Sequence, residues 1–285
     1  MTVPAPQSDV PKESPKSILF QFVLFPLGVV LIGVAIFLLF GKLASTEQSI
    51  PEYLNEIRTG SDHRKFQAAY ELSKSIKRGE AKRYPNLVQQ VIDTYRASTD
   101  DDPRIRQYLA LVLGKIGDRR ATPTLQEALR EPMVETRIYA LVALGELRDP
   151  AAVPSIIESA RDPEKDVRKT ALYTLGQSED PRAIPVLAAA LEDREADVRF
   201  NAALALARFD DRRAAGPLRE MLDRSRLDRV AGMRPDQKDE AVMAAISAYG
   251  RVMGREAAPE LQALSERDPS MRVRSAAKNA ITQLR

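Results

Sequence analysis

Apolar residues recur along the chain at helical spacing. In VRKTALYTLG (167–176), valine, alanine and two leucines fall at positions i, i+4, i+5 and i+8, which places them on one stripe of a helix. The segment SEDPRA (178–183) interrupts that pattern with a proline, which is tolerated only near the start of the next helix. PVLAAAL (185–191) then carries a second apolar face. The pattern predicts two short antiparallel helices.

This pattern repeats at a fixed interval. The glycine of the ALG motif, which we call the glycine column, recurs in one strict register, with alanine in the fourth copy and an insertion before the fifth: Gly114, Gly145, Gly176, Ala207 and Gly250. Helices below about 12–15 residues are marginal alone. A fixed period of roughly 20–50 residues predicts a stacked array, in which neighbouring units bury one continuous core.

Two further columns of charged residues follow the same register. In the helix that leads to each glycine-column position stands an arginine, which also occurs in the final partial unit: Arg106, Arg137, Arg168, Arg199 and Arg274. Shortly after the glycine column stands an aspartate: Asp118, Asp149, Asp180 and Asp211.

The consensus VRxxALxxLGxxxDPxAIPxLxxAL resembles the HEAT-like repeat, in particular the bacterial variety named after the phycobilisome lyases. The likeness is strong over 102–222 and looser over 236–285, and 60–101 resembles a divergent first repeat. The resemblance implies an all-α fold, an α-solenoid of stacked antiparallel helix pairs. It also implies that each column arginine pairs with a column aspartate of the neighbouring turn, as a structural ladder. The alternative is a ladder of arginines that binds phosphate.

An uncharged apolar run precedes the repeats. Residues 17–41 contain no charged side chain, and the run is long enough to cross a bilayer about 30 Å thick. We expect a single transmembrane helix there, behind a disordered tail over 1–16 and before a juxtamembrane linker or helix over 42–59. We expect the span to lie in the inner membrane. Two lysines precede the run and one follows closely, so the positive-inside rule favours a C-terminal domain on the exported side of that membrane, with the cytoplasmic side as the alternative.

Composition excludes several kinds of chemistry. The chain has no cysteine and one histidine, His63, so thiolate metal sites and Ser-His-Asp catalysis lack their residues. The net charge of +3 is too balanced to predict a nucleic-acid partner. No isolated pair of carboxylates suggests acid catalysis. We therefore expect no catalytic residue, cofactor or metal.

The remaining function is recognition of another protein. An inserted loop over 223–237, within the repeats of 102–285, carries arginines and apolar residues and lies where solenoids often bind; the alternative is a tolerated loop whose apolar residues pack on the core. We expect the concave surface to be lined by second-helix residues. The candidate protein-binding residues are Gln126, Arg130, Glu158, Arg161, Arg219, Glu220, Arg226 and Arg229.

Together these features resemble membrane-bound bacterial HEAT-repeat proteins. They predict a membrane-tethered scaffold whose protein partner is itself membrane-associated, because the linker to the span is short. The alternative is a bilin-lyase-like or other small-ligand enzyme that uses the solenoid groove.

Overall fold

The computed structural model describes residues 25–44, 48–77, 83–230 and 232–284. The chain divides into two compact units, Met1–Ser49 and Ile50–Arg285. Every regular element in the described residues is a helix. The tail expected over 1–16 lies outside the described residues.

The first unit contains α2 (Phe25–Ala44), which is apolar on all sides. Over residues 27–37 its large apolar side chains are exposed, from 48% for Val34 to 75% for Phe37. Within the part of the chain that the structure describes, no helix combines the length and the apolar character needed to cross a membrane. The span expected over 17–41 begins with residues 17–24, which lie outside that part, so it stays a prediction.

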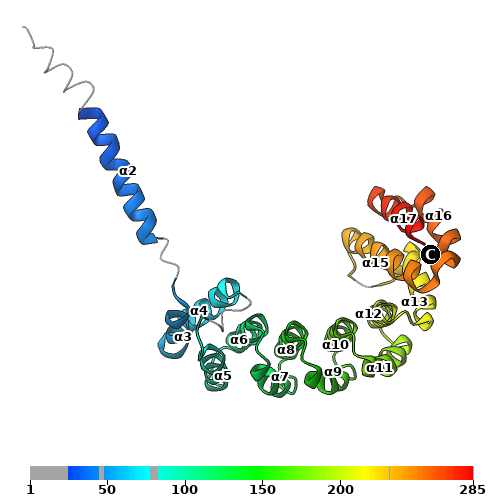
Figure 1. Ribbon diagram of the computed structural model, residues 1–285, viewed down its shortest axis with the longest axis horizontal. Coiled ribbons are helices and arrows are strands. Elements are labelled where there is room, and N and C mark those ends of the chain that lie inside the picture. Colours follow the sequence, from blue (N-terminus) through cyan, green and yellow to red (C-terminus); the bar gives the residue numbers. More distant parts are fainter. Residues whose placement is uncertain (1–24, 45–47, 78–82, 231, 285) are drawn as a thin grey trace, which may run out of the picture. The chain divides into compact units, whose positions relative to one another are not determined.

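The second unit is a series of helix pairs. After α3 (Ile50–Thr59), the first helices of the pairs are α4 (Asp62–Ser75), α6 (Pro103–Ile116), α8 (Val134–Leu147), α10 (Lys165–Ser178), α12 (Ala196–Leu206), α15 (Pro235–Met253) and α17 (Met271–Gln283). The second helices are α5 (Leu87–Ala97), α7 (Thr122–Ala128), α9 (Val153–Ser159), α11 (Ile184–Ala189), α13 (Ala215–Leu222) and α16 (Ala258–Arg267). Within this unit the pairs stack into an arc. The first helices line its inner side, and α7, α9 and α11 lie on its outer side (Figure 1).

Each first helix of the central units ends at a sharp turn. Gly117 follows α6 with φ of 74°, in the left-handed region that glycine adopts without steric cost. In the next three units the same place in the register is held by Arg148, Glu179 and Asp210, with φ of 48°, 55° and 55°. These three residues close the turn against the ordinary preference of L-amino acids.

A one-turn 3-10 helix then leads into each second helix of the central units. These short elements are η3 (Arg119–Ala121), η4 (Pro150–Ala152), η5 (Pro181–Ala183) and η8 (Arg212–Ala214). The column aspartate before each one caps it, accepting a hydrogen bond from the backbone N–H two residues on: Asp118, Asp149, Asp180 and Asp211. The cap occupies N–H groups that no helical carbonyl reaches.

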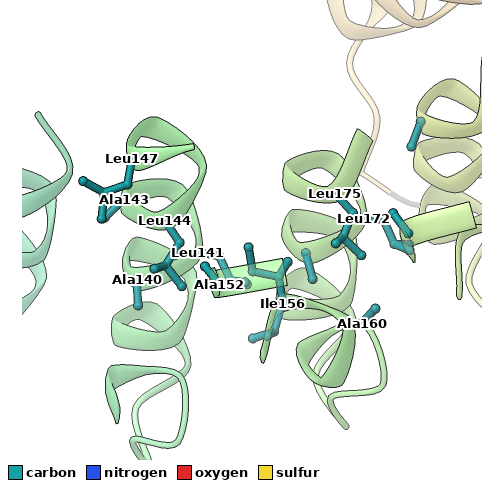
Figure 2. Close-up of a cluster of buried hydrophobic side chains, with 14 of the residues drawn as sticks. Ala140, Leu141, Ala143, Leu144, Leu147, Ala152, Ile156, Ala160, Leu172 and Leu175 are labelled. Atoms are coloured by element: carbon teal, nitrogen blue, oxygen red, sulfur yellow. The ribbon is translucent and has the colours of Figure 1, made fainter. Parts of the chain in front are cut away.

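The core runs continuously between the two rows of helices. Figure 2 shows one section of it, where Leu141 and Leu144 of α8, Ile156 of α9, and Leu172 and Leu175 of α10 are buried together. Alanines such as Ala152, which is fully buried in η4, keep the neighbouring helices close. Burial of this apolar surface is what the isolated helices lack.

The glycine column sets the spacing between consecutive first helices. A Cβ atom added to Gly114 would lie 2.7 Å from the Cα atom of Ala143 on α8. A Cβ atom on Gly176 would likewise lie 2.7 Å from the Cβ atom of Ala205 on α12. Both distances are shorter than any ordinary contact, so the glycines are required for the close packing of these helices.

Candidate functional site

The exposed face of the first helices carries a row of aromatic side chains. Phe66 and Tyr70 of α4 both meet the ring of Tyr108 on α6 edge-on, with centroids 5.8 and 5.4 Å apart, and Tyr108 meets Tyr139 on α8 at 6.3 Å. One unit further, Tyr173 of α10 is 57% exposed. The first helices therefore carry a row of half-buried rings that ends in one exposed ring, that of Tyr173.

The column arginines do not pair with the column aspartates. The expected ladder of arginine–aspartate pairs is therefore wrong in the identity of the acidic residues. Arg137 forms its ion pair with Asp162 at 2.9 Å, and Arg168 pairs with Asp193 at 2.8 Å. Arg106 pairs with Glu131 in the same way. These acids lie beyond the second helix of each unit, in the turn that enters the next unit. That turn lies within reach of the arginine side chain, whereas the column aspartate does not.

The guanidinium groups of Arg137 and Arg168 also bind the backbone of the turn that enters their own unit. Nη1 of Arg168 donates to the carbonyl oxygens of Asp162 and Pro163 at 2.9 and 3.0 Å. Arg199 and Arg274 make the same carbonyl contacts in their units. The arginine column therefore holds the turns between units in place, which is a structural role.

The column aspartates are occupied locally. Asp118, Asp180 and Asp211 each pair with an arginine two residues on. The hydrogen bond from that arginine side chain lowers the pKa of each of these three carboxyl groups. Asp149 instead accepts a hydrogen bond from Thr122 Oγ1 at 2.7 Å.

Arg224 ties the inserted loop to the last units. Its guanidinium binds both carboxylate oxygens of Asp268, at 2.8 and 2.7 Å, and Asp239 at 2.6 Å. In the register of the repeats, Arg224 occupies the place of the acids Asp162 and Asp193. A basic residue therefore stands where the other units have an acid, and the repeat pattern did not predict the contacts of Arg224 with Asp239 and Asp268.

The inserted loop over 223–237 packs on the core in part. It contains the short helix α14 (Arg224–Leu227), in which Leu227 is fully buried. Val230 is half-buried against the same core. Arg226 and Arg229 stay exposed, and Arg226 lies 4.0 Å from Asp223.

Four of the candidate protein-binding residues meet on the outer row. Gln126 and Arg130 of the α7 segment and Glu158 and Arg161 of the α9 segment line a hollow of about 300 Å³. Arg130 and Glu158 approach to 3.6 Å, and both are mostly exposed. The expectation that these residues line the concave surface is wrong, because the first helices occupy the inner side of the arc (Figure 1).

The other second-helix candidates lie apart from that hollow. Arg219 of α13 donates to the hydroxyl of Tyr249 at 2.8 Å and pairs with Glu260 at 2.7 Å, so its charge is used within the solenoid. Glu220, beside it, is exposed. The structure does not bring these two residues together with Gln126 and its neighbours.

A second hollow, which the sequence did not suggest, opens on the first helices. It has a volume of about 340 Å³ and is lined by α10, α12, η7 (Ala207–Phe209) and α15. Its polar and charged lining includes Asn201, Ser247, Arg208 and Arg251. The only signals in the sequence are the alanine that replaces glycine at position 207 and the insertion that follows it.

The sequence matches the family described as HEAT repeats over residues 91–166 and 153–234. These matches together cover about half of the chain, which therefore belongs to the HEAT-repeat family. The prediction of an all-α solenoid of HEAT-like repeats is confirmed. No curated protein matches the sequence.

Two solved structures resemble the fold. The complex of CpcE and CpcF of phycocyanin lyase from Nostoc sp. PCC7120 is 19% identical, with a TM-score of 0.54, and the match covers 85% of this chain and 96% of that one. YibA of Escherichia coli is 16% identical, with a TM-score of 0.56, over 85% of this chain and 84% of that one. At these identities the likeness concerns the fold alone.

Proposed function

We propose that this chain is a scaffold that binds another protein and acts by recognition, without catalysis. HEAT-repeat solenoids typically serve protein interaction, and membership of that family supports the proposal. The observation that carries it furthest is the uncovered inner face, where Tyr173 is 57% and Val142 37% exposed. Exposed apolar groups in a row on a rigid array are typical of a protein-binding surface.

The proposed scaffold is tethered to the inner membrane. The uncharged run 17–41 and the exposed apolar side chains of α2 both support a membrane anchor. A tethered solenoid on a short linker meets partners that are themselves at the membrane. The distribution of lysines around the run favours the exported side for the repeats.

Affinity purification of the full chain from its native host tests the scaffold. We expect one stoichiometric partner, identified by mass spectrometry. Tyr173→Ser on the inner row and Arg130→Glu on the outer row then locate the binding face, since both side chains are exposed and neither substitution removes core contacts. The double variant Arg226→Glu/Arg229→Glu tests the inserted loop, because both side chains are exposed whereas deletion of the loop would remove the buried Leu227. A wild-type chain that copurifies no stoichiometric partner would overturn the proposal.

The side of the membrane is tested with a single introduced thiol. The chain has no cysteine, and Ser225 is exposed in α14, so Ser225→Cys gives one accessible thiol. Labelling by a membrane-impermeant maleimide in cells with an intact, accessible inner membrane places the repeats outside the cytoplasm. Labelling only after lysis places them inside and contradicts the proposed orientation.

A further inference from the structure

The joint between α12 and α15 differs from the joints before it. At the earlier joints the glycine column lets consecutive first helices touch, as Gly176 does against Ala205. At this joint the column holds Ala207, and the chain inserts α14 before α15 begins. As a result α12 and α15 pack over a much smaller region than α10 and α12 do. The hollow of about 340 Å³ lies at this joint.

One side of the hollow is apolar. Tyr173 and Leu204, which hold the same register position in successive units, both line it, and α15 contributes Ala244 and Ala248. Tyr173 is 57% exposed here, although a residue with a ring of this size normally buries most of its surface. A ligand that covered the ring would bury apolar area that the solenoid leaves in water.

A neighbouring hollow lies along the same helix, α15. This larger hollow, of about 750 Å³, lies between α15 and α17 and shares the lining residues Ser247 and Arg251 with the hollow of about 340 Å³. We call the two together the α15 groove. Each hollow is as large as a typical small-molecule site, so a ligand that fills the groove is elongated. An extended peptide has this shape.

Two arginines on the α15 groove are free to bind an anion. Arg208 follows α12 and Arg251 lies in the last turn of α15, where a positive charge complements the helix C-terminus. Both are exposed, and within the described residues neither makes an ion pair or a side-chain hydrogen bond, in contrast to Arg168. In the two preceding units the place of Arg208 is held by Glu146 and Gln177. Those two units therefore lack the arginine that Arg208 supplies beside Arg251 at this joint.

We propose that the α15 groove binds an extended peptide segment of the protein partner in which an acidic side chain lies next to an apolar one. This inference rests on the proposed scaffold function. The carboxylate binds Arg208 and Arg251, and the apolar side chain covers Tyr173 and Leu204. The side chains of Asn201 and Ser247 offer donors and acceptors to the peptide backbone. Two cations beside an apolar wall suit one carboxylate, whereas a nucleic acid requires a longer run of positive charge.

Selection from a library of random heptapeptides displayed on phage tests the proposal. The bait is the full chain in mild detergent, compared with the double variant Arg208→Ala/Arg251→Ala. We expect the wild-type chain to enrich peptides that carry aspartate or glutamate beside a leucine or an aromatic residue. The double variant, which truncates exposed side chains and keeps the helical circular dichroism, should not enrich them.

Fluorescence anisotropy on the selected peptides then gives the size of the effect. Replacing the acidic residue by its amide, or both arginines by alanine, should weaken binding about ten- to a hundredfold, as expected for hydrogen bonds to a charged group. Arg255→Ala is the matched control, because Arg255 is exposed in η9 (Gly254–Ala257) and lines neither hollow. It should leave the affinity unchanged.

Three results would overturn the groove assignment. Peptides that bind the double variant as well as the wild type would place the site elsewhere and leave the scaffold function standing. A free anion such as N-acetylglutamate that competes as tightly as the peptide would identify a small-anion pocket instead. A library that yields no binder removes the peptide groove, and the copurification experiment then decides separately whether the scaffold function stands.

Discussion

Arg168 and Asp193 join two successive repeats through a bidentate ion pair. Nε and Nη2 of the arginine donate to the two carboxylate oxygens at 2.8 and 3.1 Å, and the two side chains are only 8% and 15% exposed. The remaining nitrogen of the same guanidinium binds the turn that enters its own unit. One side chain therefore fixes two successive turns between units.

Arg168→Ala should destabilise the solenoid by about 2–3 kcal/mol, because it leaves a largely buried carboxylate and two carbonyl groups without their donor. Arg199→Ala should cost less, since Arg199 contacts backbone carbonyls. Urea unfolding followed by circular dichroism gives both midpoints. Equal midpoints for the two variants would contradict the structural role assigned to the bidentate pair.

Stability should fall in acid. The pKa of Asp193 is lowered overall: burial raises it, but the hydrogen bonds from Arg168 and from the N–H of Glu195 outweigh burial. A carboxyl group whose folded pKa lies below its unfolded value adds stability above the unfolded value, and this stability is lost as the pH falls through the folded pKa. The ordinary value is 3.8, so the urea midpoint should hold from pH 7 to about pH 5 and decline below it.

Asp193→Asn is the control for this pH dependence. The amide cannot titrate, so the variant should be less stable than wild type at pH 7 and lose less on acidification. Asp118, Asp180 and Asp211 also have lowered pKa values, so part of the acid effect should remain in the variant. An unchanged slope in the variant would show that Asp193 contributes nothing to it.

Gly114→Ala should destabilise the array by about 1–3 kcal/mol, the usual cost of an added methyl group in a packed interior. The new Cβ would lie 2.7 Å from the backbone of Ala143, which cannot move aside as a side chain can. Gly216→Ala on α13 is the matched control, because no atom lies within 4 Å of its added Cβ. There the loss of glycine flexibility should leave stability unchanged or raised by up to about 1 kcal/mol. Thermal melts distinguish the two outcomes.

Glu179→Gly should stabilise the protein. Glu179 ends α10 with φ of 55°, a conformation that disfavours every side chain with a Cβ. Relief of this strain should give about 0.5–1 kcal/mol, after the entropy that glycine adds to the unfolded chain. Gln177→Gly, two residues earlier within the helix, should instead lower stability by about 1 kcal/mol. A lower unfolding midpoint for Glu179→Gly would contradict the assignment.

The sequence located the helix pairs because their signals are local. The buried stripe in 167–176 and the break at SEDPRA both act within a few residues of where they stand. Because the repeat interval is fixed, the helix pair identified in one unit predicted the helix pairs of the other units. The glycine column served to align the repeats, and its role as the contact between consecutive first helices emerged only from the structure.

The acidic partner of the arginine column depends on three-dimensional spacing. Each unit offers two acids in register, for example Asp149 in the cap of the second helix and Asp162 in the next turn. The rise from one pair to the next decides which carboxylate Arg137 reaches, and no residue pattern encodes that rise. The direction of curvature is also a property of the whole stack, which is why the inner face was assigned to the wrong row of helices.

The reversed charge at Arg224 also has a mechanical consequence. The arginine-to-acid pairs brace the joints from α6 to α12, where glycines keep the first helices in contact. Between α12 and α15 the described residues show neither the glycine contact nor an ion pair of the arginine column. The pairs Arg212–Glu256, Arg219–Glu260 and Arg224–Asp239 join the units there instead. Exposed side-chain pairs yield more readily than helices packed backbone against backbone, so this joint should take up more of the strain applied to the ends of the stack than the joints before it. A ligand seated in the α15 groove would act there as a wedge that sets the angle between two stiff blocks.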